Sequence, residues 1–147
     1  MKSTNFMGGG ARNVTFRDSA IRNTVKQGVI MTLDYHDPNA ILDYKRSTVP
    51  GQFRDIRVAN VTIEDAAGAA IQVKGDSAHD AFHENVAFAL VRFKGRAGAQ
   101  IDGLRNSSFS DVSFAGAEGD PWNIEGSEGL RFDLSLIHIS EPTRQAE

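Results

Sequence analysis

The chain alternates apolar and polar residues over short stretches, and one such stretch recurs along its length. Asn13-Val14-Thr15-Phe16 returns as Asn60-Val61-Thr62-Ile63, as Leu90-Val91-Arg92-Phe93 and as Asp111-Val112-Ser113-Phe114. Alternation with a period of two, together with Val, Ile, Thr and Phe, predicts β-strands rather than helices. Recurrence of the same phrase indicates that one structural unit is stacked along an axis.

A second short apolar segment follows each copy, and we expect it to form a second strand of the unit. These segments are Val29-Ile30-Met31, Ile71-Gln72-Val73, Gln100-Ile101 and Trp122-Asn123-Ile124. The alternation changes phase between Ala59 and Asn60, and again between Phe109 and Val112, which predicts a bend or a new strand at both places. Glycines between the segments supply the turns.

The interval from Phe16 to Ile63 is longer than the intervals between the later copies. Residues 34–52 contain two prolines and many polar residues, so we interpret them as a loop inserted into one coil. An antiparallel β-sandwich would also have many short strands separated by turns. The repetition of the phrase favours a β-solenoid, because the strands of a sandwich need not resemble one another.

Composition excludes several classes of function. The 147 residues suffice for one domain, and the net charge of -3 without a long basic run lacks the footprint of a nucleic-acid-binding protein. The apolar stretches are too short for membrane insertion. The absence of cysteine excludes disulfides and thiolate metal sites.

Longer segments resemble family 28 of the glycoside hydrolases, the polygalacturonases. The resemblance begins at Lys2-Ser3-Thr4 and residues 8–18, and continues through residues 28–35, 52–56, 71–78 and 101–105 to about Phe132. Within the family, the chain is most similar to bacterial exo-acting enzymes. The resemblance implies an all-β, right-handed, single-stranded parallel β-helix. It also implies hydrolysis of α-1,4-galacturonosyl bonds in polygalacturonate or oligogalacturonides, with inversion and without a cofactor.

The same resemblance indicates that part of the family pattern is missing. The family's catalytic carboxylates lie in Asn-x-Asp and Asp-Asp motifs, followed by Gly-His-Gly, and none of these strings occurs here. Met1-Lys2 resembles the end of the Arg-x-Lys motif that comes next, so we expect residues 1–133 to be the C-terminal coils of a longer enzyme. Residues 134–147 match a translated sequencing adapter, and we interpret them as read-through rather than natural structure. We expect the longer enzyme to be monomeric and secreted or periplasmic.

Two residues are candidates for substrate binding because of the resemblance. Lys2 corresponds to the lysine of Arg-x-Lys, whose ammonium group suits the carboxylate of galacturonate and discriminates against a neutral sugar. Tyr35 corresponds to a tyrosine near the catalytic subsite, where a phenol can hydrogen-bond a sugar hydroxyl and present an apolar face to the ring. The alternatives are a frayed terminal lysine and an ordinary loop tyrosine.

Other candidate residues favour structural interpretations. His79 and His83 have a spacing that could hold zinc on a helix, but Gly75-Asp76-Ser77 indicates a loop there. Trp122 could stack on a sugar, but a residue that fills the end of the solenoid core is the better interpretation. The sequence therefore offers no metal site.

Two other functions remain open from the sequence. A non-catalytic β-helical module could bind acidic polysaccharide or a partner protein. A pectin-active lyase of the same fold would depend on calcium, but no carboxylate cluster in the sequence requires a calcium site. The polygalacturonase interpretation differs from both because it requires the missing carboxylate motifs elsewhere in a longer protein.

Overall fold

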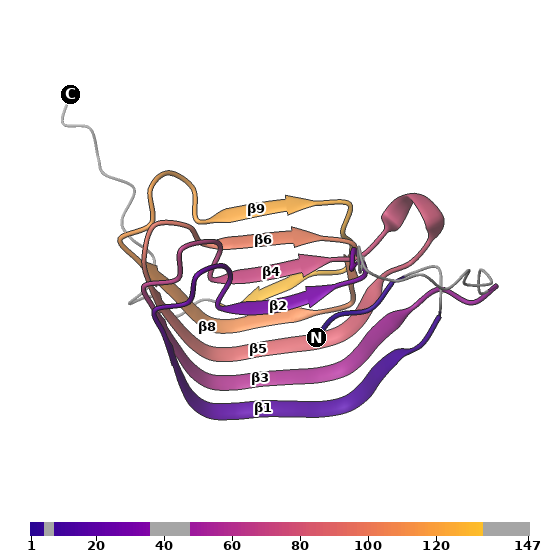
Figure 1. Cartoon of the computed structure of the whole chain (residues 1–147), viewed down its shortest axis with the longest axis horizontal. Coiled ribbons are helices and arrows are strands. Elements are labelled where there is room, and N and C mark those ends of the chain that lie inside the picture. The colour runs from indigo at the N-terminus through magenta and orange to yellow at the C-terminus, as the bar shows by residue number, and fades with distance from the viewer. Residues whose placement is uncertain (5–7, 36–47, 134–147) are drawn as a thin grey trace.

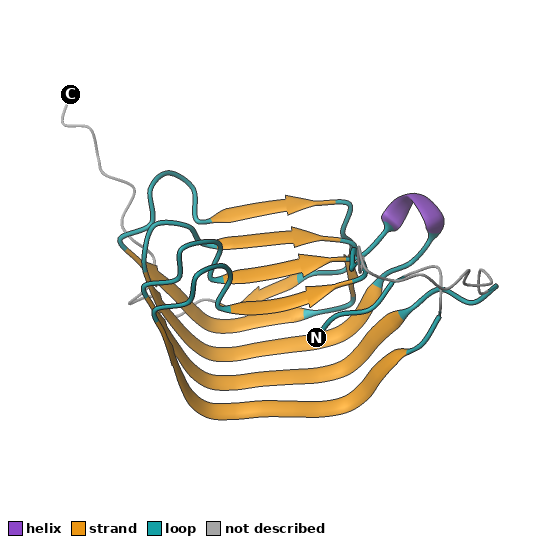
Figure 2. Ribbon diagram, viewed as in Figure 1, coloured by secondary structure: helices purple, strands orange, loops and turns teal. Residues whose placement is uncertain are grey.

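The computed structural model describes residues 1–4, 8–35 and 48–133 of the chain, which form stacked coils of β-strands (Figures 1 and 2). The elements are β1 (Gly10–Arg22), β2 (Val29–Thr32), β3 (Gln52–Glu64), β4 (Ile71–Lys74), the short 3₁₀ helix η1 (Ser77–His79), β5 (His83–Lys94), β6 (Ala99–Asp102), β7 (Leu104–Arg105), β8 (Ser108–Ala115), β9 (Trp122–Glu125) and β10 (Arg131–Asp133). None of the helical segments within these ranges is long and apolar enough to span a membrane.

The strands form two sheets that face each other across the core. One sheet has the order β1-β3-β5-β8-β10, with β7 also on β5, and contains the long strands β1, β3, β5 and β8, whereas the other sheet consists of the short strands β2-β4-β6-β9. Each coil therefore contributes one long and one short strand, as Figure 1 shows. Every pair of these named strands is parallel, which confirms the predicted parallel β-helix and excludes the antiparallel sandwich.

The predicted change of phase inside the long strands is a bend at a left-handed residue. Asn60 has a φ of 52°, and Asp111, which is two coils away in the same position, also has a φ of 52°. Asn and Asp tolerate this conformation better than other residues with a side chain, because their short polar groups can hydrogen-bond locally. Both predicted bends are therefore confirmed.

The bends line up from coil to coil as ladders of Asn and Asp. The side-chain nitrogen Nδ2 of Asn60 donates a hydrogen bond to Asp18 Oδ1 at 2.9 Å. In the same way, Asn85 Nδ2 donates a hydrogen bond to Asp55 Oδ1 at 2.7 Å. Leu90 occupies the position between Asn60 and Asp111 with a φ of 54°, where a leucine side chain is strained. These ladders fix the register of the long sheet at its corners.

The register corrects one alignment that the sequence predicted. Ile63, Phe93 and Phe114 are equivalent, as expected, but Phe16 pairs with Val58, and Ile21 pairs with Ile63. The first copy of the phrase is therefore displaced by one bend. The cause is that β1 and β3 each have two bends, five residues apart, at Asn or Asp, so a five-residue shift superposes one Asn or Asp on another and keeps the apolar alternation. The predicted loop at residues 34–52 lies mostly outside the described residues.

Aromatic side chains stack along the core at the C-terminal end of the described coils. Phe88 and Phe109 stack with ring centroids 5.1 Å apart, and Phe109 stacks on Phe132 at the same distance. Trp122 meets Phe109 and Phe114 edge-on, each with centroids 5.0 Å apart. The interpretation of Trp122 as a core-filling residue is confirmed, because its ring packs among these phenylalanines.

Candidate functional site

The two residues predicted to bind substrate lie next to each other. The first residues of the chain run beside the end of β2: the Ser3 amide donates a hydrogen bond to the Thr32 carbonyl at 2.8 Å, and the Tyr35 amide donates one to the Ser3 carbonyl at 3.2 Å. This pairing brings Lys2 Nζ to 5.6 Å from the centre of the Tyr35 ring. A cation at that distance over an aromatic face is attracted to it.

The Lys2–Tyr35 pair borders a hollow of about 240 Å³ at the surface of the short-strand sheet. Lys26 and Lys74 also line this hollow, whereas Asp34 is the single carboxylate among the described residues of its wall. Three ammonium groups against one carboxylate give the hollow a net positive charge. Such a site suits an anionic ligand, and Tyr35, which is 46% exposed, offers it a phenol and an aromatic face.

Lys74, like Lys26, is a residue of this site that the sequence did not indicate. Its Nζ lies 2.6 Å from Asp34 Oδ2, and this hydrogen bond raises the pKa of Lys74. The pair neutralises the carboxylate beside Tyr35, so Asp34 does not cancel the charge of Lys2. Lys74 pairs in register with Thr32. Alignment of the second strands of successive coils would therefore have placed Lys74 beside the end of β2, near Tyr35.

A buried histidine supports Lys74 from the interior of the coil. His83 is 0% exposed, its Nδ1 accepts a hydrogen bond from the Phe53 amide at 3.2 Å, and its Nε2 lies 3.0 Å from the Lys74 carbonyl oxygen. These partners require a neutral ring with the proton on Nε2. Burial lowers the pKa of His83 to about 4.

The two histidines considered for zinc do not share a site. Both ring nitrogens of His83 contact backbone groups, whereas His79 is exposed and its Nδ1 lies 2.7 Å from Asp76 Oδ2. Across residues 1–4, 8–35 and 48–133, no three histidine or carboxylate side chains gather as metal ligands would. The histidine spacing instead reflects one core position and one loop position.

Comparisons with known proteins find relatives of the chain. No family model matches the chain. It is 38% identical over 140 residues to the exo-poly-α-D-galacturonosidase of Dickeya chrysanthemi, in an alignment that covers 92% of this chain and 23% of that enzyme. It also matches the solved structure of the family 28 exopolygalacturonase of Yersinia enterocolitica, with a TM-score of 0.73 and 39% identity over 91% of this chain.

The chain is homologous to a segment of the family 28 exopolygalacturonases. It spans 23% of the length of each of these relatives. The resemblance that the sequence suggested is therefore confirmed, and so is the β-helical fold. The roles of Lys2 and Tyr35 remain predictions, because the homology identifies the family without assigning a function to either residue.

Proposed function

We propose that the hollow beside Lys2 and Tyr35 binds a galacturonate residue of polygalacturonate in an exo-acting polygalacturonase of which this chain is a part. The longer enzyme would hydrolyse α-1,4-galacturonosyl bonds with inversion. The observation that carries the proposal is the location of Lys2 Nζ over the Tyr35 ring, in a hollow lined by two further lysines. An ammonium group and a phenol together suit the carboxylate and the hydroxyl groups of this sugar.

This chain by itself would bind the substrate without cleaving it. Inverting glycosidases need one carboxylic acid and one carboxylate about 6.5–9.5 Å apart, with water between them. The Asn-x-Asp and Asp-Asp strings that supply these groups in the family do not occur in the sequence. Because the polymeric substrate is too large to cross a membrane unaided, the proposal also assigns the longer enzyme to the periplasm or the outside of the cell.

Equilibrium binding of trigalacturonate to the 147-residue chain tests the site. Lys2→Met should weaken binding about 10- to 100-fold, because a hydrogen bond to a charged group contributes about 1.5–3 kcal/mol. Lys94→Met is the matched control, since Lys94 ends β5 on the long-strand sheet and should leave binding unchanged. Calorimetry at low salt would measure both. Equal affinities for wild type and Lys2→Met would overturn the assignment of Lys2.

An assay of reducing-sugar release tests the second half of the proposal. The purified chain should release none from polygalacturonate above background. Measurable hydrolysis would show that the chain has its own acid and base. Binding without hydrolysis by the chain is also what a non-catalytic polysaccharide-binding module would show. The sequence of the gene for the longer protein would distinguish these two functions, because a catalytic enzyme must encode the Asn-x-Asp and Asp-Asp motifs that this chain lacks.

A further inference from the structure

The two end strands of the long-strand sheet each present an exposed phenylalanine. Among the described residues, β1 begins the order of this sheet and β10 ends it. Phe16 in β1 is 42% exposed, and Phe132 in β10 is 43% exposed. The two rings belong to one column of equivalent positions, whose members from β1 to β10 are Phe16, Val58, Phe88, Phe109 and Phe132. The same apolar column is therefore accessible at both ends of the stack.

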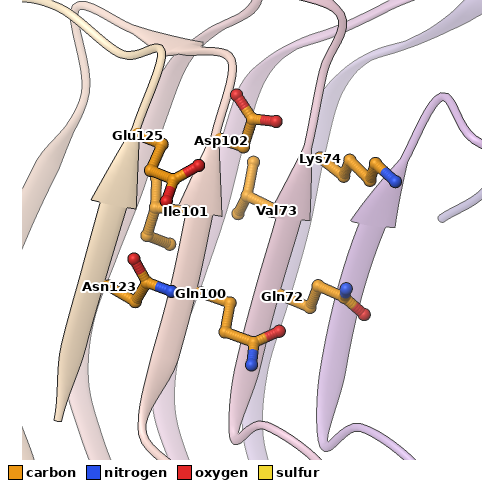
Figure 3. Close-up of a pocket in the computed structure, with 8 residues that line it drawn as sticks. All are labelled: Gln72, Val73, Lys74, Gln100, Ile101, Asp102, Asn123 and Glu125. Atoms are coloured by element: carbon orange, nitrogen blue, oxygen red, sulfur yellow. The ribbon is translucent and has the colours of Figure 1, made fainter.

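Columns of equivalent side chains run along the whole stack, because the strands are parallel and in register. Figure 3 shows one of them on the short-strand sheet, where Gln72, Gln100 and Asn123 lie on neighbouring strands. The first and last members of a column face away from each other at opposite ends of the stack. A second copy that is stacked in the same direction would therefore continue the columns, with its β10 beside β1 of the first copy.

The two ends of the stack have steps that complement each other. At one end, Lys2 forms a parallel bridge with Thr32 of β2, so residues 1–4 lie one layer beyond the coil of β1 and β2. At the other end, β10 pairs with β8 and lies one layer beyond the coil of β8 and β9. When β10 of one copy occupies the layer next to β1 of another, β9 occupies the layer next to residues 1–4. The two steps then fit together in one arrangement.

This arrangement also brings opposite charges together. Arg17 in β1 and Asp133 in β10 are the first and last members of the column beside the phenylalanines. Arg12 and Glu128 are the first and last members of another column. All four side chains are exposed. Each column therefore places an arginine of one copy beside a carboxylate of the next, which favours this partner and this register.

We propose that the 147-residue chain assembles head to tail with further copies of itself, with β10 of one copy pairing in parallel with β1 of the next. Phe132 then packs on Phe16, and Asp133 faces Arg17. The two surfaces differ, and stacking continues the axis of the coils, so the contact does not close into a ring and the assembly grows as an open filament. In the longer enzyme proposed above, further coils would take the place of the second copy. The inference does not depend on the proposed function.

Sedimentation velocity at increasing protein concentration tests the assembly. The wild-type chain should form species larger than a dimer. Arg17→Glu should weaken association about 10-fold, because a carboxylate then faces Asp133 in place of an ion pair. Arg57→Glu is the matched control, since it makes the same change of charge at an exposed residue of β3, which has strands on both sides. A wild-type chain that stays monomeric or stops at a dimer overturns the inference, as does equal association of the two variants.

Mixing two variants with reversed charges tests which surfaces meet. Asp133→Arg should also weaken association, because the new side chain faces Arg17. A mixture of Arg17→Glu chains and Asp133→Arg chains should associate as the wild type does, because every contact between unlike chains again joins opposite charges. Circular dichroism checks that each variant keeps its strands. A symmetric contact between two β1 strands would leave Asp133→Arg unaffected, and non-specific aggregation would not be restored by mixing. Either result overturns the proposal.

Discussion

The first and second coils have the same strand pattern, but their inward side chains differ in burial. Phe16 in β1 is 42% exposed, whereas Val58, its partner in β3, is 2% exposed. Val14 and Ile21 are likewise more accessible than Ile56 and Ile63, which are buried. In a solenoid, a coil buries its apolar residues against neighbours on both sides. The comparison teaches that burial here depends on the position of a coil in the stack more than on its own sequence.

The exposed side chains of the first coil form an open apolar surface. They line a hollow of about 310 Å³ together with Met31, Val58 and residues of β2. The long strand β1 pairs only with β3 among the described residues, so no described strand covers its other edge. An unpaired edge beside an apolar surface favours association with another chain. The second coil has neither feature, because β1 and β5 cover its two edges.

The largest expected effect is the difference in stability lost when a phenyl ring is removed from the exposed first coil or from the third coil, which has neighbours on both sides. Phe88→Ala should lower the free energy of unfolding by about 3–5 kcal/mol, because Phe88 is 0% exposed and its loss leaves a cavity. Phe16→Ala should cost about 1 kcal/mol, because much of this ring already faces solvent. Urea denaturation measures both. Equal costs would mean that the exposed first coil and the covered third coil contribute alike, and Phe88→Leu provides a milder variant if Phe88→Ala does not fold.

Acid should destabilise the buried region through His83 and leave the exposed first coil unaffected. The pKa of His83 is about 4 in the folded state and about 6.5 in the unfolded chain, so the unfolded chain binds the proton first as pH falls. Stability is therefore complete above about pH 6.5 and is lost progressively toward pH 4. The loss should reach about 3 kcal/mol.

The contribution of His83 to the pH dependence of stability can be measured by comparing wild type with a variant that lacks the imidazole ring. His83→Phe should lower stability at pH 7, because the Phe53 amide loses its partner, but it should flatten the pH dependence between pH 6.5 and 4. His79→Gln is the control, since it removes an exposed histidine and leaves the buried ring of His83 in place. Denaturation curves at several pH values measure the slopes. Identical slopes for wild type and His83→Phe would contradict the assignment.

The smallest expected effect concerns the corner ladders that both coils share. Leu90 is 46% exposed and has a φ of 54° between Asn60 and Asp111. Leu90→Asn should stabilise the protein by about 1 kcal/mol, because asparagine tolerates this conformation and leucine does not. Leu90→Ala is the control and should gain little, since alanine keeps the steric cost of a Cβ atom. A rise in melting temperature for Leu90→Asn alone would confirm the ladder's role.

Much of the fold could be predicted from the recurring phrase, because strand alternation is a local property. The second strands at Ile71-Gln72-Val73 and Gln100-Ile101 lie inside β4 and β6, and the bend at Asn60 is where the phase changes. The alignment of the first coil failed because two similar bends in each strand make a five-residue shift nearly neutral in sequence. Only pairing between coils distinguishes Phe16–Val58 from Phe16–Ile63.

Two residues of the candidate site could be predicted from the sequence, but from family resemblance rather than from the recurring phrase that predicted the fold. Lys2 and Tyr35 were indicated by family resemblance, whereas Lys74 was not, because nothing in its local sequence shows that it reaches Asp34. His83 was considered for metal binding, although its ring nitrogens contact Phe53 and Lys74 in the core. Residues 134–147, interpreted as adapter read-through, lie outside the described residues.

The sequence by itself determined the strands, the bends and the β-helical class, because each depends on the period of apolar residues and on Asn or Asp at left-handed positions. Tertiary structure decided which coil is buried, which histidine has a lowered pKa, and which charged side chains lie on the same surface. Those properties depend on contacts between residues far apart in the chain, such as Lys74 with Asp34 and His83 with Phe53. Stacking of one coil on the next creates such contacts, and no single coil contains them.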